Sequence, residues 1–338
     1  MKHLLIKTTA VSVLSWVIGS SLAMAAPLKV VSSFSILADM VQQVGGDKIE
    51  SRTIVGPEGD AHSFEPRPSD SKTLQDADLL FINGAHFEEW LPRLIESAGY
   101  QGKVVETIEG VPLRAYAEEA EGQNYSLETS HSHDHGHDHE HDHDHDHDHD
   151  HHDHDHSHVH DHGDYDPHAW QSLEHAQVYI SNIRNALIEA DPVHEAYYQQ
   201  QADGYQKKLK ALQSEMRAAF EQLPKASRTV VTSHDAFAYL GQDYNIEFLS
   251  LLGASNQAEP SAKELAGLID FMRDNQVKAV FVENISNPKL LQQIATETGA
   301  KLGDALYSDA LAKAPHPADS YLGLMKWNAE ALLKALGG

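Results

Sequence analysis

Four side chains able to bind a metal ion stand beside predicted strands or helices, in four separate parts of the chain. His62 follows a β-branched run, in GDAHSFEP, and His168 precedes a predicted helix, in DPHAW. His234 ends a strand-like run, in VVTSHD, and Asp309 follows the last predicted strand, in LYSDAL. Neutral imidazole and carboxylate are good Zn²⁺ ligands, and three histidines with one aspartate complete a four-coordinate shell. These residue types indicate a metal site.

The donor set also indicates which metal. Mn²⁺ is a harder ion and would favour more carboxylate, so the nitrogen-rich set points to zinc, although affinity order alone would also admit Cu²⁺. Each residue has a plainer interpretation as well. A histidine at a strand end is more often a surface or hydrogen-bonded residue, and Asp309 could cap the following turn. No compact motif such as His-x-x-x-His connects the four, so spacing alone leaves the site a hypothesis.

The elements that must position these residues alternate between strand and helix patterns. We predict strands at residues 28–32, 51–55, 79–82 and 104–106, and after the middle of the chain at 229–232, 246–249, 277–282 and 302–307. Helical patterns lie between them, at 36–44, 69–75, 90–97, 169–190, 261–273, 289–298 and 321–336. Such alternation predicts two α/β lobes, each a parallel sheet flanked by helices. Ligands of open α/β sheets bind beyond the carboxyl ends of strands, so two residues from each lobe could converge across a cleft.

One long helical pattern separates the two lobes. Asp191-Pro192 supplies an N-cap and a proline at the first helical position, and apolar residues then recur at three- and four-residue spacing as far as Phe220. About 30 residues at 1.5 Å each make a helix of about 45 Å, long enough to run along both lobes. We therefore expect an N-terminal lobe at 26–190, a linking helix at 191–223 and a C-terminal lobe at 224–338.

The first 25 residues are typical of an export signal. Lys2 and Lys7 precede a short apolar stretch at 11–18, and Ala23-Met24-Ala25 fits a small-x-small cleavage site. An uncleaved membrane anchor is disfavoured because about 20 consecutive apolar residues are missing. The chain has no cysteine, which excludes disulfides, thiolate ligands, a thiol nucleophile and lipid attachment at a cysteine. We predict a periplasmic location.

A second group of histidines forms a repeat. Residues 131–162 contain seventeen His, ten Asp and one Glu with no Lys or Arg, so eleven of the 26 net negative charges lie there. This segment has almost no apolar residue, and we expect a disordered loop at about 118–164, inserted into the N-terminal lobe. Clustered imidazoles bind metal, and we favour a zinc-collecting loop over a solvated segment with no role in transport. The acidic balance argues against nucleic acid as a partner.

Beyond these patterns, several motifs occur in a specific order: His62 with Pro66-x-Pro68-Ser69-Asp70, Asp166-Pro167-His168-x-Trp170, Ser233-His234-Asp235-Ala236-Phe237 with Tyr239-Leu240, Glu259-Pro260-Ser261, and Leu306-x-x-Asp309-Ala310-Leu311 with residues 321–328. With them the chain resembles the metal-binding proteins of zinc and manganese ABC importers, known as cluster A-I or family 9 solute-binding proteins. The likeness covers nearly all of the chain after residue 25.

The resemblance implies two lobes joined by one rigid helix, with the metal between them. Carried over residue by residue, His62, His168, His234 and Asp309 fall on the four metal positions. The manganese branch has a carboxylate where His234 stands, which supports zinc. Some zinc members use another carboxylate or water in place of Asp309, and Asp60 or Glu65 is then the alternative.

The resemblance also implies a function. We expect a binding protein that captures Zn²⁺ and delivers it to an ABC permease of the inner membrane and its ATPase. We expect a monomer, with a periplasmic metallochaperone as a further candidate partner. The alternatives are a binding protein for manganese or another divalent metal, and a periplasmic zinc buffer. A zinc hydrolase is disfavoured, because catalytic zinc keeps an open position near a general base, and neither His-Glu-x-x-His nor a nucleophile elbow occurs. We therefore expect no enzyme.

Overall fold

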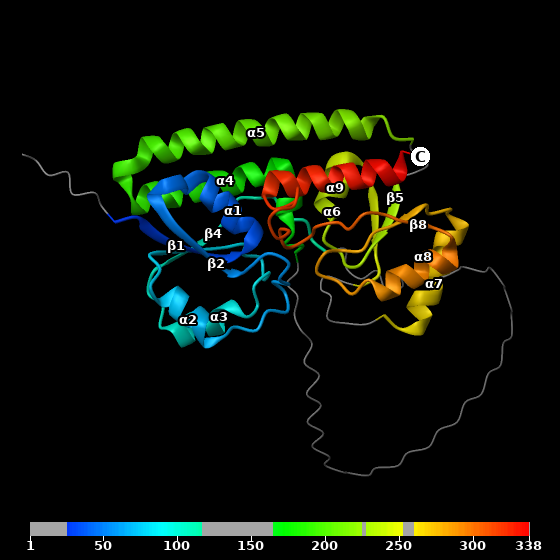
Figure 1. Ribbon diagram of the computed structural model, residues 1–338, viewed down its shortest axis with the longest axis horizontal. Coiled ribbons are helices and arrows are strands. Elements are labelled where there is room, and N and C mark those ends of the chain that lie inside the picture. Colours follow the sequence, from blue (N-terminus) through cyan, green and yellow to red (C-terminus); the bar gives the residue numbers. More distant parts are fainter. Residues whose placement is uncertain (1–25, 117–164, 225–227, 253–259, 338) are drawn as a thin grey trace, which may run out of the picture.

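The structure, a computed structural model, describes residues 26–116, 165–224, 228–252 and 260–337 (Figure 1). The predicted export signal, the His/Asp repeat and Glu259 lie outside the described residues. Two α/β lobes lie side by side beneath one long helix (Figure 1). The fold class expected from the sequence is confirmed.

The N-terminal lobe contains a four-stranded parallel sheet in the order β2-β1-β3-β4. Its strands are β1 (Leu28–Phe34), β2 (Ile49–Val55), β3 (Leu79–Ile82) and β4 (Lys103–Glu106). Its connecting helices are α1 (Ser35–Gly45), α2 (Pro68–Gln75) and α3 (Leu91–Ala98). β3 is buried along its whole length, as expected of a strand covered on both faces.

The C-terminal lobe repeats this topology in the order β6-β5-β7-β8, again all parallel. Its strands are β5 (Thr229–Thr232), β6 (Glu247–Ser250), β7 (Ala279–Val280) and β8 (Lys301–Leu302). The helices are α6 (Ala238–Tyr244), α7 (Ala262–Asp274) and α8 (Lys289–Thr298). A buried cluster around Val231, Leu268 and Ile294 forms a core of its own between this sheet and α7 and α8.

Two strands of this lobe are shorter than predicted. The patterns at 277–282 and 302–307 suggested strands of six residues, but regular pairing stops after two residues in each. Gly303 packs so closely on the ring of Phe281 that a Cβ would collide with it, and its N–H donates a hydrogen bond to the Val280 carbonyl at 2.9 Å. Pairing resumes at a single bridge between Glu283 and Leu306. The segment after this bridge leads into the loop that carries Asp309.

The linking helix α5 (Glu195–Glu221) runs along both lobes (Figure 1). Its 27 residues span about 40 Å at 1.5 Å per residue. It packs on α1 and on α4 (Leu173–Ala190) in the N-terminal half, and on α6 and the C-terminal helix α9 (Tyr321–Leu336) in the other half. Its buried face has the predicted spacing: Tyr198, Ala202, Tyr205, Leu209, Leu212, Met216 and Phe220. The exact domain bounds stay a prediction.

Two helix starts differ from the prediction. Pro192–His194 forms a 3₁₀ turn before α5, and the Asp191 carboxylate contacts the His194 ring at 2.6 Å and accepts a hydrogen bond from the Tyr198 hydroxyl at 2.8 Å instead of capping the backbone. Ala169–Gln171 is likewise a 3₁₀ turn, and Ser172 caps α4. Among the described residues, no helix is both long and apolar enough to cross a membrane.

Candidate metal site

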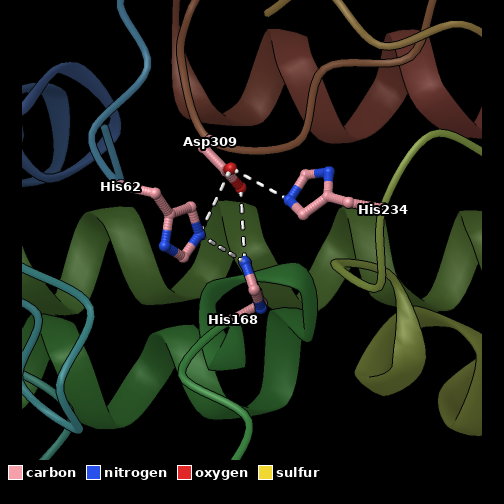
Figure 2. Close-up of side chains that lie close together, drawn as sticks. All are labelled: His62, His168, His234 and Asp309. Carbon is pink, nitrogen blue, oxygen red and sulfur yellow. Dashed lines mark hydrogen bonds and ion pairs between the residues drawn. The ribbon is translucent and has the colours of Figure 1, made fainter. Parts of the chain in front are cut away.

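The four residues singled out from the sequence meet between the two lobes (Figure 2). One ligand atom from each of His62, His168, His234 and Asp309 lies within 4.8 Å of the other three. His62 comes from the loop after β2 and His168 from the loop before α4, whereas His234 follows β5 and Asp309 precedes α9. Each lobe therefore supplies two groups. His168, His234 and Asp309 are fully buried, and His62 is partly buried.

The distances fit one small cation. The Nε2 atoms of His62 and His168 are 3.1 Å apart, and Asp309 Oδ2 lies 3.2 Å from His234 Nε2. The Asp309 carboxylate oxygens lie 3.7 Å from Nε2 of His62 and 3.7 Å from Nε2 of His168. Ligands about 2 Å from a tetrahedral Zn²⁺ are separated by about 3.3 Å, so these side chains are already near the required spacing.

Several buried atoms at the centre have no hydrogen-bond partner among the described residues: His234 Nε2, Asp309 Oδ1 and Asp309 Oδ2. The first of these lies within ion-pair distance of the aspartate but not in hydrogen-bond geometry. Buried polar atoms are almost always hydrogen-bonded, because leaving them unpaired costs about 1–3 kcal/mol each. A cation at this point would satisfy all three.

Two of the three rings each have a carboxylate in contact with Nδ1. Asp166 Oδ1 contacts His168 Nδ1 at 2.8 Å and accepts a hydrogen bond from the His168 backbone N–H at 2.9 Å. Glu283 Oε2 lies 2.6 Å from His234 Nδ1, and Oε1 accepts the His234 backbone N–H at 2.9 Å. Such partners orient a ligand imidazole and raise its basicity. Asp166 belongs to the motif around His168, but sequence reasoning missed Glu283.

The two alternative carboxylates lie outside the four-residue group. Asp60 accepts hydrogen bonds from the His62 backbone N–H at 2.9 Å and from the Ser63 hydroxyl at 2.6 Å, so it shapes the loop that carries His62. Glu65 is exposed. The geometry therefore places Asp309, rather than Asp60 or Glu65, among the three imidazoles.

The charges in this site act on each other. Burial alone would lower the pKa of His234, but the negative charges of Glu283 and Asp309 outweigh it and raise that pKa well above its usual value. Burial would raise the pKa of Asp309, whereas the imidazoles of His234, His168 and His62 hold it well below its usual range. The carboxylate is therefore charged, as a metal ligand must be.

The loop that carries Asp309 is held by both lobes. Its Ser308 carbonyl accepts hydrogen bonds from Trp170 Nε1 at 2.9 Å and Gln171 Nε2 at 2.7 Å, both from the N-terminal lobe. Leu311 donates its N–H to the Ser35 hydroxyl at 3.0 Å. On the other side, Leu306 pairs with the segment around Glu283. The position of Asp309 thus depends on contacts between the lobes.

Aromatic rings surround the histidines. Phe87 packs edge-on against His62 with ring centroids 4.5 Å apart, and Trp170 packs against His168 at 5.2 Å. Phe87 and Trp170 contact each other, and both are buried. These apolar walls limit water access and lower the local dielectric, which strengthens attraction between an ion and its ligands.

Comparison with known proteins identifies the family. The family model described as "Zinc-uptake complex component A periplasmic" matches residues 30–335. The chain belongs to this family. Members of the zinc-uptake component A family are metal-binding substrate-binding proteins of ABC transporters, so this chain is a substrate-binding protein and not an enzyme.

Relatives within this family are named for different metals. The chain is 30% identical over 311 residues to the iron-binding protein YfeA of Yersinia pestis, covering 91% of this chain and 86% of that one. It is 29% identical over 315 residues to the manganese ABC transporter substrate-binding lipoprotein PsaA of Streptococcus pneumoniae, covering 91% and 89%.

Solved structures show the same fold. A periplasmic metal-binding protein from Candidatus Liberibacter asiaticus superposes with a TM-score of 0.72 at 26% identity, covering 91% of this chain and 99% of that one. The periplasmic zinc-binding protein TroA of Treponema pallidum gives a TM-score of 0.74 at 23% identity, covering 92% and 99%. The two-lobed architecture is therefore that of metal-binding proteins, whereas the choice of metal must be argued from the site.

Proposed function

We propose that this protein captures one Zn²⁺ ion between its lobes, with His62, His168, His234 and Asp309 as the ligands. The observation that carries the proposal is the convergence of three imidazole nitrogens and one carboxylate at near-tetrahedral spacing. Four-coordinate sites of nitrogen and oxygen donors suit Zn²⁺.

The same donor set argues against manganese. Mn²⁺ prefers harder oxygen ligands and a higher coordination number. Here one carboxylate faces three rings, while two further buried carboxylates, Asp166 and Glu283, contact the Nδ1 atoms on the far sides of their rings. Manganese- and iron-named relatives make a manganese or other divalent metal importer the alternative.

Membership of this family supports a role in delivering the bound ion to a transporter. We infer that the loaded protein works in the periplasm and hands zinc to an ABC permease in the inner membrane, with its ATPase on the cytoplasmic side. A periplasmic zinc buffer is the second alternative. Uptake of radioactive zinc by cells that lack the protein separates these functions, because loss of a buffer would leave uptake at low zinc intact.

The repeat at 131–162 supports a second step within the same function. The described residues that flank it are joined, since Ala115 bridges to Tyr165 and Asp166 donates its N–H to the Arg114 carbonyl at 2.9 Å. The described residues on either side of 117–164 are therefore paired two to three residues before His168. We propose that the repeat collects zinc close to the site, with a periplasmic metallochaperone as a candidate donor.

A competitive metal titration tests the zinc proposal. The protein without residues 131–162 is titrated with Zn²⁺ and with Mn²⁺ against a chelator, alongside His62→Ala, His168→Ala, His234→Ala and Asp309→Ala. We expect one tight zinc per chain, weaker manganese, and a loss above about 100-fold in zinc affinity in each variant, because each removes a direct ligand rather than a supporting group.

His194→Ala provides the matched control. His194 is also held by an aspartate, at 2.6 Å from Asp191, but it lies at the start of α5 and outside the four-residue group. Its loss should leave zinc affinity unchanged. Tight manganese with feeble zinc would refute the proposal in favour of the manganese importer.

A further inference from the structure

We propose that Glu283 is a positioning residue that prepares His234 for the metal and gives the site its preference for zinc over manganese. This inference rests on the proposed zinc site. Glu283 is 1% exposed, and it lies in the short segment between β7 and α8. It contacts the ligand residue rather than the ion position, because Oε2 lies beside Nδ1 of the ring and Oε1 accepts the backbone N–H of the same residue.

Glu283 holds both the ring and the main chain of one residue. Oε1 accepts the His234 backbone N–H at 2.9 Å, and Oε2 lies 2.6 Å from His234 Nδ1. The second contact is bent away from ideal hydrogen-bond geometry. At that distance, however, only a shared proton avoids repulsion between two lone pairs. The carboxylate therefore keeps a proton on Nδ1.

A proton on Nδ1 determines which nitrogen can bind the ion. In a neutral imidazole one ring nitrogen donates and the other accepts. When an ion displaces the second proton of the ring, Nδ1 remains the donor and Nε2 presents its lone pair, and Nε2 is the atom that lies 3.2 Å from Asp309. Figure 2 shows this edge of the ring directed at the centre of the group. Glu283 thus selects the tautomer that the proposed site requires.

His234 and Glu283 follow two neighbouring strands of one sheet. β5 and β7 are neighbours, and Phe281 donates its N–H to the Val231 carbonyl at 2.8 Å just before the two side chains meet. Glu283 itself receives a further contact, since its N–H donates to the Ser233 hydroxyl at 3.4 Å. Because both residues belong to the C-terminal lobe, a change in lobe separation does not break their contact.

The N-terminal lobe has a related arrangement with a different geometry. Asp166 stands two residues before His168 and uses a single oxygen, Oδ1, for both the ring and the backbone N–H. Glu283 is 49 residues from His234 and uses both oxygens. An amide at position 166 could therefore retain both contacts through its one oxygen, whereas an amide at position 283 cannot.

The expected consequence is selectivity. A negative charge behind an imidazole raises its donor strength toward the metal. Zn²⁺ takes more of its binding energy from nitrogen donors than Mn²⁺, which prefers oxygen. Removing the charge of Glu283 should therefore weaken zinc binding more than manganese binding. The ratio of zinc affinity to manganese affinity should fall.

Glu283→Gln tests the inference, because glutamine keeps the shape but offers only one acceptor oxygen. We expect zinc affinity to fall about 10- to 100-fold, with a smaller loss for manganese, in the protein without residues 131–162. Glu88→Gln is the control. Glu88 is also a buried glutamate, but it accepts hydrogen bonds from the Ser33 hydroxyl and the backbone N–H groups of Asn83 and Gly84. That variant should keep the wild-type ratio of zinc to manganese affinity.

A measurement on the unmutated protein covers the case in which the variant fails to fold. Long-range ¹H–¹⁵N spectra of the zinc-loaded protein should show His234 with a protonated Nδ1 and a metal-bound Nε2. Metal on Nδ1, or an unchanged zinc-to-manganese ratio in a folded Glu283→Gln variant, would overturn the role of Glu283. If the unmutated protein itself binds zinc weakly, the proposed function fails instead.

Discussion

Each imidazole at this site is prepared by its surroundings before an ion arrives. Asp166 and Glu283 contact the Nδ1 atoms of two rings, and Phe87 packs edge-on against the third ring, that of His62. Together with Asp309, three carboxylates are buried around three histidines. Buried charges are costly unless they are paired, so a bound divalent cation should stabilise the fold as well as fill the site.

A buried glutamate close to this site makes the stability of the metal-free protein depend on pH. Burial raises the pKa of Glu88 to about 7, although Ser33 and the backbone of Asn83 and Gly84 favour its charged form. Folded Glu88 therefore holds its proton more tightly than the unfolded chain does. Its contribution to stability is complete below the unfolded pKa and is lost as the pH rises through about 7.

We expect Glu88→Gln to flatten this dependence. In the wild-type protein without metal, the unfolding free energy should fall between pH 5 and pH 8 by on the order of 3 kcal/mol more than in Glu88→Gln, which cannot ionise. Denaturant unfolding at both pH values, with chelator present, measures the difference. Equal falls in the two proteins would show that Glu88 does not titrate in this range.

The site was largely predictable from sequence, with one clear gap. His62, His168 and His234 each lie in a local motif, and the structure brings them together with Asp309. Glu283 directly follows the predicted strand at 277–282, on the edge where ligands gather, and that position was the available signal. Its partner is 49 residues away and is reached through strand pairing, which a local motif does not reveal.

At the scale of elements, two helices have the predicted bounds, whereas two strands are shorter than predicted. The helices at 289–298 and 321–336 begin and end where predicted, because a glycine or a serine marks one of their ends. The predicted strands at 277–282 and 302–307 were wrong in length, because regular pairing between them covers two residues, with one further bridge between Glu283 and Leu306. The extent of strand pairing is a tertiary feature, which β-branched composition cannot indicate.

The long helix contains a glycine that its packing does not need. Gly204 lies inside α5, and a Cβ built there would meet no atom within 4 Å. Gly204→Ala should therefore raise the unfolding free energy by about 1 kcal/mol, because alanine loses less backbone entropy in a helix. Gly241→Ala in α6 is the contrasting change, because its Cβ would lie 2.5 Å from the Ile246 carbonyl oxygen.

Denaturant unfolding of both variants checks this prediction. Gly204→Ala should be more stable than the parent with the same zinc affinity, and Gly241→Ala should be less stable. A loss of stability in Gly204→Ala would indicate that the glycine has a packing or bending role in α5.

For the whole molecule, the important feature is that neither lobe holds the site alone. Two proposed ligands come from each lobe, and the Asp309 loop is bonded to Ser35 and Trp170 on one side and to the Glu283 segment on the other. α5 contacts helices of both lobes and limits their relative movement. Binding and release of an ion should therefore involve small displacements between the lobes.

The repeat at 131–162 should add capacity without changing the main site. Its seventeen histidines lie outside the described residues. Deleting them should leave one tight zinc per chain in a titration, remove the additional weak ions, and slow growth when zinc is scarce. Unchanged zinc stoichiometry together with unchanged growth would refute the zinc-collecting role.

The most direct test of the central claim is a crystal structure of the zinc-loaded protein, with diffraction recorded on both sides of the zinc absorption edge. We predict a single strong anomalous peak between the lobes, about 2 Å from Nε2 of His62, His168 and His234 and from a carboxylate oxygen of Asp309. A peak located elsewhere, or an ion with three or more oxygen ligands, would contradict it.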